Sequence, residues 1–156
     1  MMLKLTEDLM IGNAAIDCDH QGLIDIINRF LDDAKICEFL GDTISNNYHE
    51  IMHNTLKDLV NYTREHFERE EKIQRECMYE YHEMHKREHR ALVVQVEEMA
   101  RDYFVRKTKK IDLKAMSELN EFMKFWLINH IKKFDTNMRP WVADNNSDAL
   151  NSTIEK

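Results

Sequence analysis

The amino-acid sequence predicts an all-α protein, an up-down-up-down four-helix bundle preceded by an irregular N-terminal arm. Its 156 residues include only three glycines and one proline. Both residues are disfavoured inside helices, so their scarcity allows long helical segments. Apolar residues also recur at spacings of three and four in four separate segments, which is the periodicity of a helix with one buried face. Short connections between the segments favour an antiparallel bundle.

The elements are expected in the following order along the chain. Residues 1–16 form the arm, and Asp17 is a suitable N-cap for the first helix. Pro140 stops the fourth helix, because proline cannot continue a helical hydrogen-bond pattern. We expect the four helices at about residues 17–38, 44–75, 78–106 and 112–138. Residues 1–142 then form one domain, and the polar residues 143–156 form a tail or linker.

Composition excludes several classes of partner. The net charge of −7 gives no reason to expect a nucleic acid. No apolar stretch approaches the roughly 18 residues that cross a membrane, and the N-terminus has no signal-peptide pattern. We therefore expect a cytoplasmic protein. Cys18, Cys37 and Cys77 show no paired spacing and are read as free thiols.

Side chains of the metal-binding kind fall on the apolar faces of all four segments. They are His20, His66, Glu70, His85, His89, His130 and Asp135. Residues four apart lie on one side of a helix, so His66 and Glu70 point the same way, and so do His85 and His89. Polar groups buried in this number are costly unless they are bound by a partner, and a cation reverses that cost. The sequence therefore predicts a metal centre inside the bundle.

The donor set indicates which metal is bound. Imidazoles and carboxylates without thiolates suit iron, manganese or zinc, and seven donors exceed the four of a tetrahedral zinc. Two iron ions that share both carboxylates and divide the imidazoles as three and two use all seven. On an ideal helix, however, His130 and Asp135 lie about 140° apart. We therefore expect a local widening of the helix, of the π-bulge kind, near residues 130–135.

Four sequence blocks contain the candidate ligands. They are Gly12 with Ile16-Asp17-Cys18-Asp19-His20, His66-Phe67-Glu68-Arg69-Glu70-Glu71, His85-Lys86-Arg87-Glu88-His89 and Trp126-Leu127-Ile128-Asn129-His130-Ile131-Lys132-Lys133-Phe134-Asp135. Together these blocks resemble the hemerythrins, and most closely the bacteriohemerythrins, over about residues 8–136. The resemblance implies that His85, His89 and His130 hold one iron and that His20 and His66 hold the other. It also implies that Glu70 and Asp135 bridge the irons together with an oxo or hydroxo group. Dioxygen would bind at the open position of the second iron.

Two intervals look longer than is usual in bacterial members of the family, around residues 37–50 and 105–112. We expect both in loops or helix ends, where they could change how the pocket is covered. The remaining histidines are read differently. His49 and His53 lie off the apolar face and are expected at the surface, whereas His82 is in phase with His89 and could support the site from outside the ligand set.

The leading functional hypothesis is reversible dioxygen binding at a non-haem diiron site, without a catalytic residue. It would serve oxygen carriage, or oxygen and redox sensing with a possible C-terminal signalling output domain. The alternatives are a diiron enzyme that acts on peroxide or nitric oxide, and a bundle with structural zinc. The gas pocket should be apolar and dry. Its candidate walls are Leu23, Ile24, Ile27, Tyr62, Phe67, Trp126 and Leu127.

Overall fold

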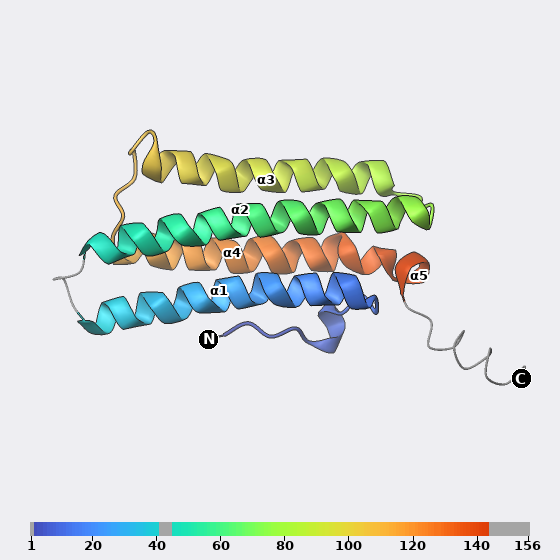
Figure 1. The fold of residues 1–156 in the computed structure, drawn as a ribbon, viewed down its shortest axis with the longest axis horizontal. Helices are drawn as coiled ribbons and strands as arrows, with labels where there is room; N and C mark the ends of the chain where they lie inside the picture. Colours follow the sequence, from blue (N-terminus) through green and yellow to red (C-terminus); the bar gives the residue numbers. More distant parts are fainter. Residues whose placement is uncertain (1, 41–44, 144–156) are drawn as a thin grey trace, which may run out of the picture.

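A computed structural model describes residues 2–40 and 45–143 and confirms an all-α four-helix bundle (Figure 1). Each long helix runs antiparallel to the one before it, and the N-terminal arm lies along the outside of the first. The long helices are α1 (Ala14–Leu40), α2 (Ser45–Glu76), α3 (His82–Phe104) and α4 (Leu113–Lys133). Three short helices complete the described chain, namely η1 (Glu7–Leu9), η3 (Asp135–Met138) and α5 (Arg139–Val142). No helix among the described residues combines the length and apolarity that a membrane crossing requires.

The core follows the apolar periodicity of the sequence. Large side chains from different helices, among them Phe30, Leu59 and Met123, are completely buried. Each such side chain contributes roughly 1.5–3 kcal/mol through its removal from water. The third helix begins later than predicted, at His82 rather than at residue 78. Met78, the first residue of the predicted helix, lies in the turn after α2 with a φ of 56° and is 84% exposed.

The first helix begins earlier than predicted, and Asp17 is not its N-cap. Asn13 holds that position, since its Oδ1 accepts hydrogen bonds from the N–H groups of Ala15 (3.1 Å) and Ile16 (3.2 Å). Asp17 instead accepts from the N–H groups of Ile11 (2.7 Å) and Gly12 (3.0 Å). It therefore ties the arm back onto the helix, and it does so around a left-handed turn at Gly12, whose φ is 85°.

The end of the bundle also differs from the prediction. Pro140 does not stop the fourth helix but lies in the first turn of α5, where its missing N–H costs nothing. Arg139 donates hydrogen bonds to the carbonyls of Asp8 (2.8 Å) and Met10 (2.9 Å). Asn13 donates to the carbonyl of Val142 (2.9 Å). The arm and α5 are thus joined at the end of the bundle that holds the α2–α3 turn (Figure 1).

The described parts of both long intervals lie at the opposite end of the bundle, at the end of α1, the start of α2 and the α3–α4 connection (Figure 1). Residues 41–44 of the first interval lie outside the described residues. The second interval is a loop between α3 and α4, which begins where Arg106 forms ion pairs with Glu98 and Asp102. The effect of the first interval on how the pocket is covered stays a prediction.

Candidate metal centre

All seven predicted donors meet in the interior of the bundle, and none is more than 3% exposed. We call them the metal cluster: His20 from α1, His66 and Glu70 from α2, His85 and His89 from α3, His130 from α4, and Asp135 from η3. Four helices and one short helix therefore each supply at least one donor. Because residues four apart share a helix face, α2 and α3 each present two side chains to the same point.

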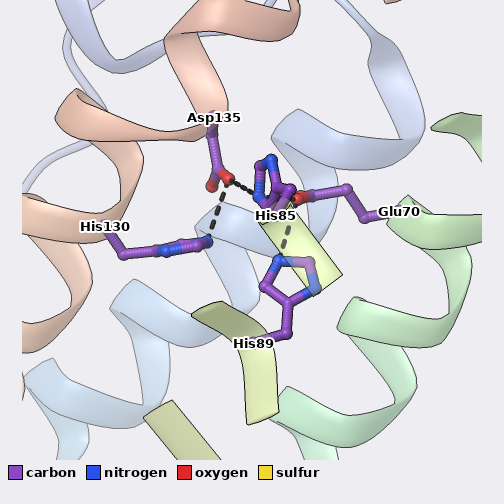
Figure 2. Close-up of side chains that lie close together, drawn as sticks. All are labelled: Glu70, His85, His89, His130 and Asp135. Atoms are coloured by element: carbon purple, nitrogen blue, oxygen red, sulfur yellow. Dashed lines mark ion pairs between the residues drawn. The ribbon is translucent and has the colours of Figure 1, made fainter. Parts of the chain in front are cut away.

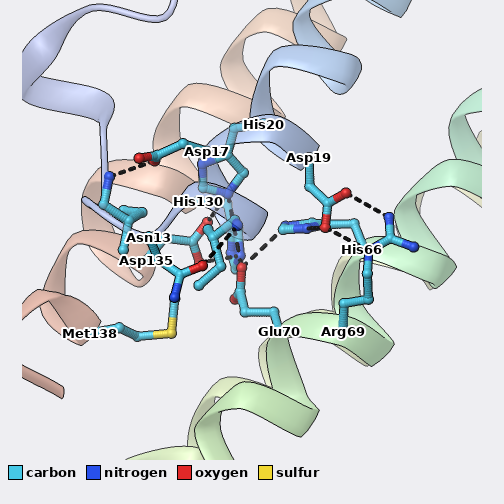
Figure 3. Close-up of polar contacts among 12 residues, drawn as sticks. Asn13, Asp17, Asp19, His20, His66, Arg69, Glu70, His130, Asp135 and Met138 are labelled. Carbon is cyan, nitrogen blue, oxygen red and sulfur yellow. Dashed lines mark hydrogen bonds and ion pairs between the residues drawn. The ribbon is translucent and has the colours of Figure 1, made fainter. Parts of the chain in front are cut away.

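The cluster divides into two overlapping groups. The three-imidazole group consists of His85, His89 and His130 with both carboxylates, and its donor atoms all lie within 4.8 Å of one another (Figure 2). The two-imidazole group consists of His20 and His66 with the same carboxylates, under the same limit (Figure 3). Glu70 and Asp135 are the only members common to the two groups among the described residues.

Each carboxylate turns one oxygen toward each group. Glu70 Oε1 lies 2.9 Å from His85 Nε2, whereas Glu70 Oε2 lies 3.1 Å from His66 Nε2. Asp135 Oδ1 lies 2.9 Å from His85 Nε2 and 3.0 Å from His130 Nε2. Its Oδ2 lies 2.9 Å from His20 Nε2. Both carboxylates could therefore be shared by two ions, one beside the three imidazoles and one beside the other two.

The inward atoms are close together but are not aligned as hydrogen bonds. All five imidazole Nε2 atoms and all four carboxylate oxygens are buried without a hydrogen-bond partner among the described residues. Leaving polar atoms buried and unpaired costs about 1–3 kcal/mol each. Nitrogens and oxygens that approach one another without donating to one another aim at shared points between them, which is what ligands of a common ion do.

The distances also fit an ion of the predicted kind. Neighbouring donors about an octahedral ion with bonds of about 2.1 Å lie about 3.0 Å apart. The closest N···O separations in the cluster are 2.9–3.2 Å. With imidazole and carboxylate donors and no thiolate, the cluster suits iron.

Asp135 enters the cluster because the fourth helix ends. The predicted distortion near residues 130–135 is present, but the backbone tightens there, so the predicted widening of the π-bulge kind is wrong. α4 stops at Lys133, and Asp135 opens the tighter 3-10 helix η3. The carbonyls at the end of α4 accept hydrogen bonds from side chains that follow it. Thr136 Oγ1 donates to Lys132 O (2.8 Å), and Asn137 Nδ2 donates to Lys133 O (2.8 Å). The chain therefore changes direction without leaving these carbonyls unpaired, and Asp135 turns inward beside His130.

In the absence of an ion, the charges of the cluster balance one another. Burial lowers the pKa of His66, but Glu70 and Asp19 overcome this effect and raise the pKa to about 10. Burial likewise opposes protonation of His85, whose pKa the two carboxylates raise to about 9. Burial and the proximity of Asp135 oppose ionisation of Glu70, yet His66 and His85 hold its pKa well below the usual range. Imidazolium and carboxylate groups thus occupy the metal-free interior.

A carboxylate outside the cluster fixes His66. Asp19 Oδ2 lies 3.0 Å from His66 Nδ1, opposite the nitrogen that faces the cluster (Figure 3). Arg69 holds this carboxylate with Nε and Nη2, at 2.9 and 2.6 Å. A carboxylate on the outer nitrogen fixes the tautomer and orientation of a metal-binding imidazole. Sequence reasoning did not find Asp19 or Arg69, because each lies beside a ligand in sequence and off the apolar face.

The other histidines remain outside both groups. His82 Nδ1 lies 2.8 Å from Gln74 Oε1, and Gln74 is completely buried with its Nε2 2.9 Å from Met138 Sδ. His82 therefore holds Gln74, which packs against η3. This position agrees with the expectation that His82 supports the site from outside the ligand set. His49 and His53 are exposed, as expected, and their rings meet the edge or face of Phe104 at 4.9 and 5.3 Å.

Comparison with known proteins agrees with this geometry. Residues 12–142 match the family model described as "Hemerythrin HHE cation binding domain". The chain belongs to the hemerythrin family. The match extends over all four long helices and includes every member of the metal cluster. It concerns the hemerythrin domain alone, so it lends no support to the expected signalling output domain.

Individual relatives lead to the same family. A bacteriohemerythrin of Pseudomonas aeruginosa strain UCBPP-PA14 is 29% identical over 129 residues, which are 83% of this chain and 74% of that protein. A bacteriohemerythrin of Stenotrophomonas maltophilia strain R551-3 is 28% identical over 134 residues, or 86% and 77% of the two chains. The resemblance read from four short blocks of sequence is therefore confirmed across most of the hemerythrin domain.

Proposed function

We propose that this hemerythrin domain holds two iron ions in the metal cluster and binds dioxygen reversibly. The observation that carries the proposal is the division of each carboxylate between the three-imidazole and the two-imidazole group. Such a division supports two ions side by side with unequal numbers of protein ligands. The ion beside His20 and His66 has one imidazole fewer and therefore has a position for an exogenous molecule. Bound iron would supply that position and the electrons that dioxygen accepts.

The protein's own contribution is a dry, apolar surrounding. Of the predicted pocket walls, Tyr62 is only partly buried, and the following are at least 95% buried: Leu23, Ile24, Ile27, Phe67, Trp126 and Leu127. Phe67 stacks on His89 with ring centroids 3.7 Å apart. Apolar walls of this kind exclude water, so a bound anion is not readily protonated and lost. The walls therefore favour release of unchanged dioxygen over its reduction.

Carriage or sensing fits the site better than turnover. Five imidazoles and two shared carboxylates leave few open metal positions, whereas enzymatic diiron sites built largely from carboxylates leave more. We therefore propose that the domain is not an enzyme. Action on peroxide or nitric oxide is the second candidate, and structural zinc the third. Steady-state turnover with peroxide or nitric oxide, measured beside dioxygen binding, separates the first two.

The direct test is anaerobic reduction of the iron-loaded protein, followed by cycles of air and argon. We expect a visible charge-transfer band that appears with dioxygen and disappears under argon. His66→Ala should abolish this band, because it removes one of two imidazoles at the proposed binding ion. His53→Ala is the matched control, a histidine of the same helix that is exposed, and it should keep the band. A band that forms once and never reverses would contradict reversible binding.

A further inference from the structure

An aromatic cluster connects the metal cluster with the protein surface. It consists of Tyr79 and Tyr81 in the turn between α2 and α3, and Trp141 in α5. The ring of Tyr79 lies 5.1 Å from that of Trp141 and 5.9 Å from that of Tyr81, at interplanar angles of 82° and 74°. Tyr81 and Trp141 are 6.5 Å apart. Tyr79 is 5% exposed, whereas Trp141 and Tyr81 are 38% and 45% exposed, so the cluster runs from the interior outward.

Tyr79 is the inner end of this cluster. Its ring lies 6.2 Å from the ring of His85, edge to face. A cavity of about 410 Å³ adjoins the contact and is lined by Tyr79, Tyr81, Met84, His85, Lys133, Phe134 and Asn137. The cavity is large enough for several water molecules. A phenol therefore lies between a proposed iron ligand and space that can hold water.

Packing alone does not account for the choice of residues. Edge-to-face contacts are favourable for any aromatic pair, and phenylalanine could make them equally well. The rings that stack on other imidazoles of the metal cluster are indeed phenylalanines, Phe67 on His89 and Phe134 on His130. Tyrosine and tryptophan differ from phenylalanine in that they lose one electron much more readily. The oxidisable rings are therefore placed beside His85, along the line that reaches the surface.

We propose that Tyr79, Tyr81 and Trp141 form a relay that carries single oxidising equivalents from the metal centre to the surface. The relay rests on the proposed diiron function. The oxidant whose reduction it supplies with electrons is hydrogen peroxide. Hydrogen peroxide takes up two electrons and two protons as its O–O bond breaks to give two waters, and iron held in the metal cluster would supply the site for that reduction. Those two electrons must come from side chains of the protein. The relay provides an ordered route, and it thereby limits which side chains become oxidised.

The electrons pass one at a time. Tyr79 gives one electron toward His85 and its phenolic proton to water in the cavity, and becomes a neutral phenoxyl radical. Trp141 then gives Tyr79 an electron and releases its indole proton, while Tyr79 regains a proton. A low-molecular-weight thiol restores Trp141 by donating a hydrogen atom. Two such passages use one peroxide and two thiols, and the two thiyl radicals combine to one disulfide. The relay therefore repairs occasional oxidation of the domain and is not its main activity, so steady-state peroxide turnover should stay slow beside dioxygen binding.

The connection between Trp141 and Tyr79 can be tested without iron. Azide radicals produced by pulse radiolysis oxidise exposed tryptophan, and Trp141 is far more exposed than Trp126, which is 4% exposed. Because the two rings exchange an electron in both directions, we expect the indolyl radical signal to decay to a steady fraction as a tyrosyl signal rises, at a rate independent of protein concentration. Tyr79→Phe should slow this conversion several-fold, and the pair Tyr79→Phe with Tyr81→Phe should abolish it. Tyr103→Phe, a buried tyrosine at the other end of α3, should leave the rate unchanged. An unchanged rate in the double variant overturns the relay.

The escape of oxidising equivalents is tested in the iron-loaded protein. After peroxide is added to the oxidised form, freeze-quenched samples should show a tryptophanyl radical that Trp141→Phe removes. Tyr79→Phe should also remove it, although Trp141 is still present, and peptide mass spectrometry should find more oxidation at His85 and Met84. If Tyr79→Phe changes neither the tryptophanyl radical signal nor the oxidation of His85 and Met84, the relay is overturned, whereas the proposal of dioxygen binding is not. A chain that fails to hold two irons overturns the proposed function, while the radiolysis result stands by itself.

Discussion

Asp19 Oδ2 lies 3.0 Å from Nδ1 of His66, which joins α1 to a proposed iron ligand of α2. Asp19 is also held by both Nε and Nη2 of Arg69, so the carboxylate cannot readily turn away. The contact commits Nδ1 of His66 to Asp19 and leaves Nε2 for the metal cluster. An imidazole that is fixed in this way binds a metal more tightly than one that is free to rotate.

Replacement of Asp19 by Ala should therefore weaken iron binding without removing a ligand. Loss of an outer partner of this kind typically lowers metal affinity about 10–100-fold. The affinity can be measured by competition with a chromophoric chelator under argon. Arg69→Gln should have a smaller effect, because Asp19 remains beside His66. Equal iron affinity in the wild type and in Asp19→Ala would mean that the contact between Asp19 and His66 does not contribute to iron binding.

Removal of iron should destabilise the bundle. The metal-free interior contains nine inward atoms without hydrogen-bond partners among the described residues, and metal-binding free energy adds to folding free energy. Free iron at a hundredfold its Kd adds about 2.7 kcal/mol to the free energy of unfolding. At about 2–4 °C per kcal/mol for a chain of this size, Tm should rise by roughly 5–10 °C. Thermal unfolding followed by circular dichroism, with iron or with a chelator, measures the difference. Identical curves would contradict a metal centre in the core.

Iron binding should release protons at pH 7. In the metal-free bundle the pKa of His66 is about 10 and that of His85 about 9, because the carboxylates outweigh the effect of burial. A raised pKa in the folded state stabilises the metal-free fold below the ordinary value of 6.5, and this contribution is lost as the pH rises toward 10. An ion must displace these protons, so iron affinity should increase with pH over the same range. Calorimetry of iron binding in buffers of different ionisation enthalpy counts the protons, and a heat that is independent of buffer would contradict this prediction.

Gly22→Ala should destabilise α1, although the same change usually stabilises a helix by roughly 0.5–1 kcal/mol. A Cβ at this position would lie 1.9 Å from the hydroxyl oxygen of Tyr62 and 2.4 Å from its ring. Overpacking of this kind typically costs about 1–3 kcal/mol. In a Tyr62→Ala background, the same Gly22→Ala change should become stabilising. Urea denaturation of the four metal-free proteins measures the coupling, and additive effects would show that Tyr62 does not limit this position.

The periodic part of the structure was predictable, and the reason is physical. A ligand that must face the core replaces a leucine or isoleucine on the apolar face, so spacing in threes and fours found the helices and six members of the metal cluster. Asp135 is out of phase with His130, and its place in the cluster was supported by the resemblance to the hemerythrins. Asp19 has no such signal, because it supports His66 from off that face. The ends of the helices were equally hidden. Asn13 as the cap of α1, the left-handed turn at Met78 and the 3-10 turn at Asp135 depend on the path of the backbone, which periodicity does not encode.

The central claim is that the cluster holds two ions rather than one, and an anaerobic titration of the metal-free protein with ferrous iron tests it most directly. We predict an endpoint of two irons per chain in the wild type. Glu70→Ala should lower it, because that carboxylate belongs to both groups, and His82→Ala should preserve it. An endpoint of one iron in the wild type, or an unchanged endpoint after loss of Glu70, would contradict the bridged pair.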